Sequence, residues 1–201
     1  MAGKLRIAAF ASHGGSNLQA LIDSCASGDI AGEIVLVICN NRKAYALERA
    51  RNHQIETLII SDTEYDSETS FAQELLRQLA ARSVGLICLA GYMKKMPNEV
   101  IRAYRNRILN IHPALLPKFG GKGMYGIHVH EAVLAAGEKE TGVTIHLVDE
   151  VYDNGRIVAQ RKVQVNPDDT PESLQHRVLE IEHQLYPETV AKIASGELRL
   201  E

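Results

Sequence analysis

The sequence predicts an α/β fold of Rossmann-like type: a mostly parallel, twisted sheet with helices on both faces and an antiparallel C-terminal extension. Two observations favour this class. From Leu5 to Pro117, compact apolar runs alternate with segments of helical spacing, as in successive βαβ units. Toward the C-terminus, two alternating apolar–polar segments follow one another with only a turn between them, which is typical of antiparallel strands.

The strands expected in the parallel part are short apolar runs bounded by glycine or polar residues. They cover residues 5–12, 34–39, 57–60, 84–90 and the start of 107–117. Helical spacing predicts helices between them, beginning after Asn17, over 44–53 and over about 66–82. A strand, a glycine turn and then a helix is how nucleotide-binding α/β units begin.

The C-terminal part is expected to contain two antiparallel strands and a long helix. The strands cover residues 142–148 and 157–165, joined by a turn at 149–155. The helix is predicted over about 171–194, because a Thr-Pro-Glu capping signal opens it. The chain shows no internal repeat, low-complexity segment or linker, so we predict a single domain over residues 1–201.

The composition argues against several classes of partner. With 45% hydrophobic residues, 23% charged residues and a net charge of -3, the chain has no electrostatic footprint for nucleic acid or an anionic membrane surface. No apolar run approaches the ~20 residues that span a bilayer, and no leader of signal type precedes the first strand. Cys25, Cys39 and Cys88 are scattered, as free thiols in a reducing compartment are. We expect a cytoplasmic protein with no nucleic-acid or membrane partner.

Three polar segments follow strands of the parallel part: residues 14–17, 92–96 and 110–112. Right-handed crossovers place the carboxyl ends of parallel strands at one edge of the sheet, where ligands of such folds bind. The three segments are therefore expected to lie together.

The first of these segments is Gly14-Gly15-Ser16-Asn17. Flexible glycines and exposed amides at a helix start favour an anion such as a phosphate. The alternative is that Ser16 or Asn17 only caps the helix. The segment is neither G-x-G-x-x-G nor a Walker loop, which disfavours a dinucleotide site.

Asn110 and His112 are two residues apart on a predicted strand, so their side chains leave from the same face. Asn offers a neutral amide donor, and His offers a ring that gains or loses a proton near neutral pH. Together they are suited to hold a developing oxyanion and manage a proton beside it. The alternative is that both side chains only satisfy backbone groups where the strand ends.

Asp153 lies in the turn between the last two strands, in the sequence Asp-Asn-Gly. It is either an ordinary turn aspartate or a partner for His112. A nearby carboxylate favours the charged imidazole and raises its pKa, so the second reading makes His112 an acid near neutral pH.

Three further features are less specific. His128 and His130 have ligand-like spacing on a predicted strand, but no cluster of metal-ligand residues accompanies them, so we predict no metal. Glu182 and His183 are expected on the solvated face of the last helix. The glycine-rich segment 120–126 is either a flexible lid over the site or a tolerated insertion.

The chain resembles the phosphoribosylglycinamide formyltransferases, the folate-dependent transformylases of purine synthesis. The resemblance covers nearly the whole length and rests on Gly14-Gly15-Ser16-Asn17-Leu18-Gln19, Leu89-Ala90-Gly91-Tyr92-Met93, Asn110-Ile111-His112-Pro113-Ala114-Leu115-Leu116-Pro117, and His146 through Asp153-Asn154-Gly155 to Gln160. It implies the formyltransferase fold, with a phosphate-binding half at about 1–100 and a catalytic and folate-binding half at about 101–201.

The resemblance also implies substrates and roles. The co-substrate would be 10-formyltetrahydrofolate and the acceptor glycinamide ribonucleotide, with no metal and a monomer or homodimer as the state of assembly. The implied catalytic residues are Asn110, His112 and Asp153. The implied substrate-binding residues are Gly15, Ser16 and Asn17 for the phosphate and Glu182 for the glycinamide. The implied folate-binding residues are Met93, Lys94, Lys95, Met96, Asn110 and Asp149.

Three departures from the family pattern concern the edges of the site. The segment 120–125 is longer than in the shortest members, Lys94-Lys95 replaces a single basic residue, and Glu68 stands where some members carry an arginine.

Three alternatives remain. A formyltetrahydrofolate deformylase usually has an extra N-terminal domain, and a methionyl-tRNA formyltransferase needs a further C-terminal domain and a basic surface. A non-catalytic nucleotide-binding module has no need of Asn110, His112 and Asp153 together.

Overall fold

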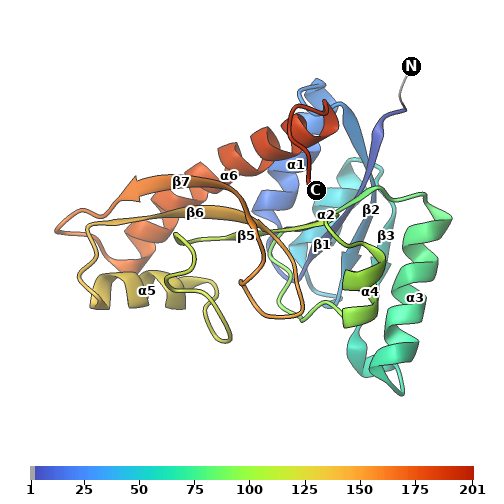
Figure 1. Ribbon diagram of the computed structural model, residues 1–201, viewed down its shortest axis with the longest axis horizontal. Coiled ribbons are helices and arrows are strands. Elements are labelled where there is room, and N and C mark those ends of the chain that lie inside the picture. Colours follow the sequence, from blue (N-terminus) through green and yellow to red (C-terminus); the bar gives the residue numbers. More distant parts are fainter. Residues whose placement is uncertain (1–2) are drawn as a thin grey trace.

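A computed structural model describes residues 3–201 (Figure 1). Its strands form one seven-stranded sheet. The strands are β1 (Leu5–Ala11), β2 (Gly32–Cys39), β3 (Thr57–Ile59), β4 (Leu86–Leu89), β5 (Ile108–His112), β6 (Glu140–Leu147) and β7 (Ile157–Gln164). Their order is β3-β2-β1-β4-β5-β6-β7. Strands β1 to β5 pair in parallel, and β6 and β7 add antiparallel. The predicted sheet and its antiparallel extension are confirmed.

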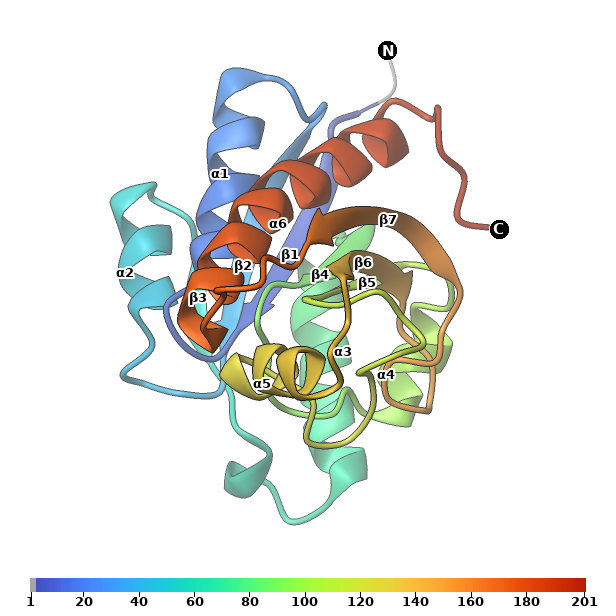
Figure 2. The ribbon, with the colours of Figure 1, turned by 90° about the vertical axis from the view of Figure 1, so that its left-hand side faces the viewer.

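Helices cover both faces of the sheet (Figure 2). The helices α1 (Ser16–Ser27), α2 (Tyr45–Asn52), α5 (Ile127–Ala135) and α6 (Pro171–Ala194) contribute to one core, while α3 (Glu68–Ala81) and α4 (Asn98–Ala103) contribute to the other. Side chains alternate between the cores along β1: Ile7 and Ala9 enter the first core, and Ala8 and Phe10 enter the second. This explains why the central strands read as unbroken apolar runs.

Two helices were not foreseen, and one of them corrects a prediction. His128 and His130 were expected on a strand but lie in α5. The four residues Ile-His-Val-His imitate strand alternation, yet the buried positions Val129 and Val133 are four apart, as on a helix. The two histidines therefore do not share a face. The short helix α4 follows Pro97 and has too few turns to show a periodic pattern.

The long helix α6 has the bounds that were predicted. The Thr170 side chain accepts from the Ser173 amide at 3.2 Å, and Pro171 occupies the first turn, where its missing N–H costs nothing. The helix packs against α1, which brings its middle to the beginning of that helix. Within residues 3–201, no helix combines the length and the apolar character needed to cross a membrane.

Candidate active site

A cavity of about 850 Å³ opens at the carboxyl ends of β1, β4 and β5. It is lined by all of the residues proposed from the sequence: Gly15, Ser16, Asn17, Met93, Lys94, Lys95, Met96, Asn110, His112, Asp149, Asp153 and Glu182. The three segments expected at one sheet edge do meet there. Their chemical roles stay predictions at this point.

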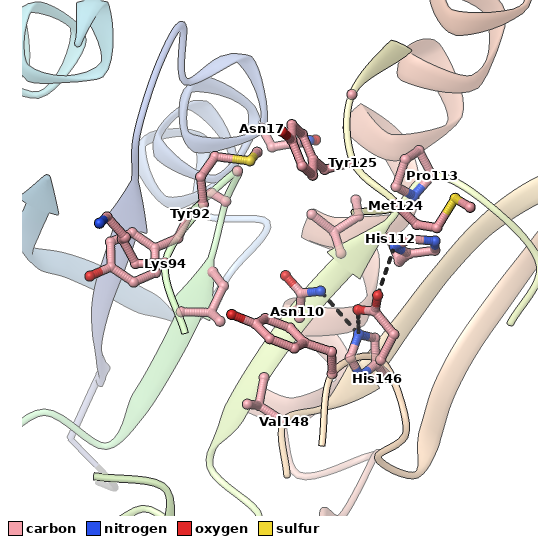
Figure 3. Close-up of a pocket in the computed structure, with 18 of the residues that line it drawn as sticks. Asn17, Tyr92, Lys94, Asn110, His112, Pro113, Met124, Tyr125, His146 and Val148 are labelled. Carbon is pink, nitrogen blue, oxygen red and sulfur yellow. Dashed lines mark hydrogen bonds and ion pairs between the residues drawn. The ribbon is translucent and has the colours of Figure 1, made fainter. Parts of the chain in front are cut away.

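His112 ends β5, and only 3% of its surface is exposed. Its Nε2 lies 2.7 Å from the Phe119 carbonyl oxygen, so this nitrogen carries the proton and donates it there. Its Nδ1 faces Oδ2 of Asp153 at 3.7 Å (Figure 3). Nδ1 is therefore the nitrogen that is free to exchange a proton in the cavity.

The prediction that Asp153 raises the pKa of His112 was wrong in its net direction. Burial disfavours the charged ring and lowers the pKa of His112 below its usual value, although Asp153 and the Phe119 carbonyl oppose this shift. The ring is therefore neutral at neutral pH.

Asp153 is held between two histidines and a loop amide. Its Oδ2 accepts from the Gly121 N–H at 2.8 Å, and its Oδ1 lies 3.5 Å from Nε2 of His146. Burial alone raises the pKa of Asp153, but the two neighbouring histidines and the Gly121 amide together lower it. Asp153 is a carboxylate at neutral pH.

His146 belongs to this cluster, and the residue patterns gave it no role. It lies on β6 directly opposite Asn110 on β5. Nδ1 of His146 is 2.9 Å from the Leu147 carbonyl oxygen, so in the neutral ring Nε2 accepts from the Asn110 amide at 3.0 Å (Figure 3). His146 thus orients Asn110. The signal that identifies it is the register between β5 and β6, which residue patterns do not specify.

The glycine turn before α1 presents backbone amides. Gly15 precedes the helix with a φ of 69°, and no side chain caps the helix start. Ser16 and Asn17 therefore do not act as caps, and the first amides of α1 have no intrahelical acceptor. The side chain of Asn17 instead donates to Oε2 of Glu182.

Glu182 was expected on a solvated helix face but is only 7% exposed. The expectation failed because α6 packs on α1, so the face that carries Gln175, Leu179 and Glu182 lines the cavity. Burial raises the pKa of Glu182 to about 7, against the opposing hydrogen bond from Asn17.

The other end of the cavity has apolar walls. Three exposed large apolar side chains line it: Met93, Val151 and Tyr152. A fourth that lines the cavity, Tyr125, lies beside Asn17 (Figure 3). The Met93 amide is tied to β1 through Ser12 Oγ at 2.8 Å. Lys94 is paired with Asp62 at 3.1 Å, and Asp149 accepts from the Val151 amide at 2.9 Å.

The sequence and the fold of this chain match those of known proteins. The model of the family described as formyl transferase matches residues 5–190. The chain belongs to this formyl transferase family.

Proteins named as transformylases of glycinamide ribonucleotide are among its relatives. The chain is similar to a phosphoribosylglycinamide formyltransferase of Haemophilus influenzae, with 38% identity over 98% of this chain and 90% of the relative. A chloroplastic phosphoribosylglycinamide formyltransferase of Arabidopsis thaliana is 44% identical, over 96% of this chain and 67% of that protein. The crystal structure of glycinamide ribonucleotide transformylase 1 from Symbiobacterium toebii superposes with a TM-score of 0.93 at 40% identity, covering 100% of this chain and 92% of the other.

Of the other residues discussed from the sequence of this formyl transferase, one lines the cavity and two lie outside it. His130 lines the cavity, is 1% exposed, and its Nδ1 has no partner within residues 3–201. His128 lies outside and is exposed, next to Glu131. Glu68 begins α3 on the surface, away from the cavity lining. The described residues contain no group of three or more side chains suited to a metal ion.

Proposed function

We propose that this chain transfers the formyl group of 10-formyltetrahydrofolate to the amine of 5′-phosphoribosylglycinamide, a step of purine biosynthesis. The observation that carries the proposal is a single cavity that joins amides without intrahelical acceptors at Gly15–Asn17 to the buried cluster of Asn110, His112 and Asp153. The names of the relatives support the same reaction.

The chemistry needs no metal and no covalent enzyme intermediate. The substrate amine attacks the formyl carbon, a C–N bond forms, and negative charge develops on the formyl oxygen. The tetrahedral intermediate then breaks its bond to N10 of the folate, which leaves with a proton, while the former amine loses one. Asn110, oriented by His146, and His112 are placed to hold the oxyanion. Losing one such donor typically costs about 100- to 1,000-fold in rate.

The lowered pKa of His112 fits this cycle. The ring is neutral at neutral pH, and its Nε2–H donates a hydrogen bond to the Phe119 carbonyl. An oxyanion close to the ring favours the charged form, so the pKa rises as the intermediate forms. The proton then resides on Nδ1, and the Asp153 carboxylate 3.7 Å away balances the charge. We propose that Asp153 also relays this proton through water.

The two ends of the cavity suit the two substrates. Gly15, Ser16 and Asn17 would hold the phosphate through backbone amides, and Glu182 would hold the glycinamide end. Met93, Lys94, Lys95, Met96, Asn110 and Asp149 would form the folate side, where the exposed apolar side chains offer walls for flat rings. Both halves of the chain line this cavity, which supports one formyltransferase domain over 1–201.

A steady-state assay tests the proposal. Purified protein is given 10-formyltetrahydrofolate with and without the ribonucleotide, and deformylated folate and formylated product are both measured. Release that requires the ribonucleotide and equals the formylated product supports the transferase. Release without the ribonucleotide contradicts it in favour of a deformylase, and no release in either case contradicts it in favour of a binding module.

A further inference from the structure

The glycine turn after β1 is held in place from its outer side. Three successive carbonyls accept hydrogen bonds from the segment that follows β2. Asn41 Nδ2 donates to the Ser12 carbonyl at 3.2 Å, and the Ala46 amide donates to the His13 carbonyl at 3.1 Å. Nε of Arg49 donates to the Gly14 carbonyl at 2.8 Å. The last of these contacts is the only one of the three made by a charged side chain.

The bond from Arg49 determines where the next amide points. The carbonyl oxygen and the amide hydrogen of one trans peptide point in opposite directions. Because the Gly14 carbonyl is directed at Arg49, the Gly15 N–H is directed away from Arg49, toward the cavity that Gly15 lines. Within residues 3–201, the backbone amides of Gly15, Ser16 and Asn17 have no hydrogen-bond acceptor outside the helix. They remain available to a ligand.

A buried side chain independently points to a ligand at this end of the cavity. Asn17 lines the cavity and is 8% exposed. Its Nδ2 is used by Glu182, but its Oδ1 is buried and has no partner among the described residues. An unpaired buried carbonyl oxygen is costly, so a donor from the ligand, such as a hydroxyl beside the phosphate, is expected to satisfy it.

Arg49 is itself fixed by further contacts. Its Nη1 lies 3.2 Å from Oε1 of Gln19 on α1, and its guanidinium stacks 5.0 Å from the centre of the Tyr45 ring. A guanidinium makes these contacts at once because it is a planar fork, whereas a lysine ammonium is a point charge. Arg49 does not line the cavity, so it acts on the turn and not on the ligand.

We propose that Arg49 is a positioning residue for the phosphorylated substrate: by holding the Gly14 carbonyl on the outer side of the turn, it keeps the Gly15 amide directed at the phosphate. The inference rests on the proposed function, because it takes residues 14–17 as the phosphate site. Arg49 is therefore expected to affect the affinity for the phosphate group and not the KM for the formyl folate or kcat.

The test compares Arg49→Lys with a matched control, Arg51→Lys. Arg51 lies on the same helix and is exposed, and its side chain makes no hydrogen bond within residues 3–201. Binding of ribose 5-phosphate is measured by titration calorimetry, together with KM for each substrate. We expect Arg49→Lys to weaken ribose 5-phosphate binding and raise KM for the ribonucleotide by about 10-fold, because a charge-assisted hydrogen bond is lost. The KM for the formyl folate, kcat and the melting temperature stay unchanged, as does every value for Arg51→Lys.

A second readout separates positioning from a general structural role. The unphosphorylated glycinamide riboside lacks the group that the turn would hold, so its kcat/KM should be equal in the parent protein and in Arg49→Lys. Equal ribose 5-phosphate affinity in both proteins overturns the inference, and so does an equal loss with riboside and ribonucleotide. If the parent binds ribose 5-phosphate but transfers no formyl group, the proposed reaction fails while the calorimetric comparison still decides the role of Arg49. If the parent does not bind ribose 5-phosphate, both proposals fail.

Discussion

The two ends of the cavity are built in different ways. The end proposed to bind the phosphate presents backbone amides of a glycine turn, which Ala46 and Arg49 of α2 hold from outside. The end proposed to be catalytic carries side chains on β5, β6 and the loop after β6, and burial and neighbouring groups together set the pKa values of His112 and Asp153. The first end depends on local chain geometry, and the second depends on the pairing of strands far apart in sequence. Substitutions at the two ends should therefore affect different kinetic constants.

The largest effect is expected from His112→Ala. Removing the ring takes away one oxyanion partner, so kcat should fall by about 100- to 1,000-fold while ribose 5-phosphate binding is unchanged. Steady-state kinetics and calorimetry measure the two effects. The matched control is His128→Ala, which removes an exposed histidine outside the cavity and should change neither constant. A near-normal rate for His112→Ala would remove this residue from the mechanism.

The substitution Gly15→Ala should weaken phosphate binding at the glycine turn. At a φ of +69° an alanine is strained, and its Cβ would lie 2.7 Å from Cβ of Ala46. Strain of about 1–3 kcal/mol corresponds to roughly 5- to 150-fold weaker binding of ribose 5-phosphate, with kcat at saturation little changed. Gly28→Ala is the control, because Gly28 has a φ of +88° with open space around it at the far end of α1. It should lower the melting temperature and leave binding intact; equal binding by Gly15→Ala would contradict the account.

The titrations of Glu182 and His130, which both line the cavity, should change the free energy of unfolding in opposite directions as the pH falls. The folded protein raises the pKa of Glu182 from 4.5 to about 7, so Glu182 takes up a proton on folding and stabilises the fold as pH falls from 7 to 5. Burial lowers the pKa of His130 from 6.5 to about 4, so His130 destabilises the fold over the same range. Each contribution amounts to about 2 kcal/mol between pH 7 and pH 5, so the two largely cancel.

Glu182→Gln should reveal this cancellation. Without the titrating carboxyl, the unfolding free energy should fall by about 2 kcal/mol more than that of the parent between pH 7 and pH 5. Urea unfolding at a series of pH values measures the difference. His130→Asn should change the slope in the opposite direction. Parallel curves for the parent and Glu182→Gln would show that Glu182 is not buried as a neutral acid.

The smallest effect is expected from His146. The variant His146→Leu removes the acceptor that orients the Asn110 amide, which should lower kcat by about 10-fold, as for the loss of one hydrogen bond of about 1.4 kcal/mol. Both KM values should stay unchanged. The variant His146→Gln offers an acceptor oxygen in its place and should recover most of the rate. Equal defects in the two variants would show that the packing of the ring matters and not its hydrogen bond.

Much of this architecture could be predicted from the sequence, for identifiable reasons. The apolar runs and the capping signal before Pro171 act locally, so the sheet strands and α6 were found at nearly their observed positions. The helix α5 was mistaken for a strand because four residues of alternation outweighed a short helical repeat. The burial of Glu182 was missed because the sequence of neither α1 nor α6 alone shows that the two helices pack together.

The protonation state of His112 could not be predicted from the sequence for a different reason. Its partner Asp153 was identified correctly in position, but the sign of the pKa shift depends on how completely the ring is buried. Burial results from the whole fold. The state of assembly and the cellular compartment stay predictions.

The register of β5 and β6 limits how chains of this kind can change in length. Asn110 lies opposite His146, and His112 lies opposite Thr144. Inserting or deleting one residue in β6 would move Ile145 or Leu147 opposite Asn110 and turn His146 to the other face. The part of the glycine-rich loop after Gly121 lies outside this pairing. When homologous chains are aligned, gaps are therefore expected there and not between Gly142 and Leu147.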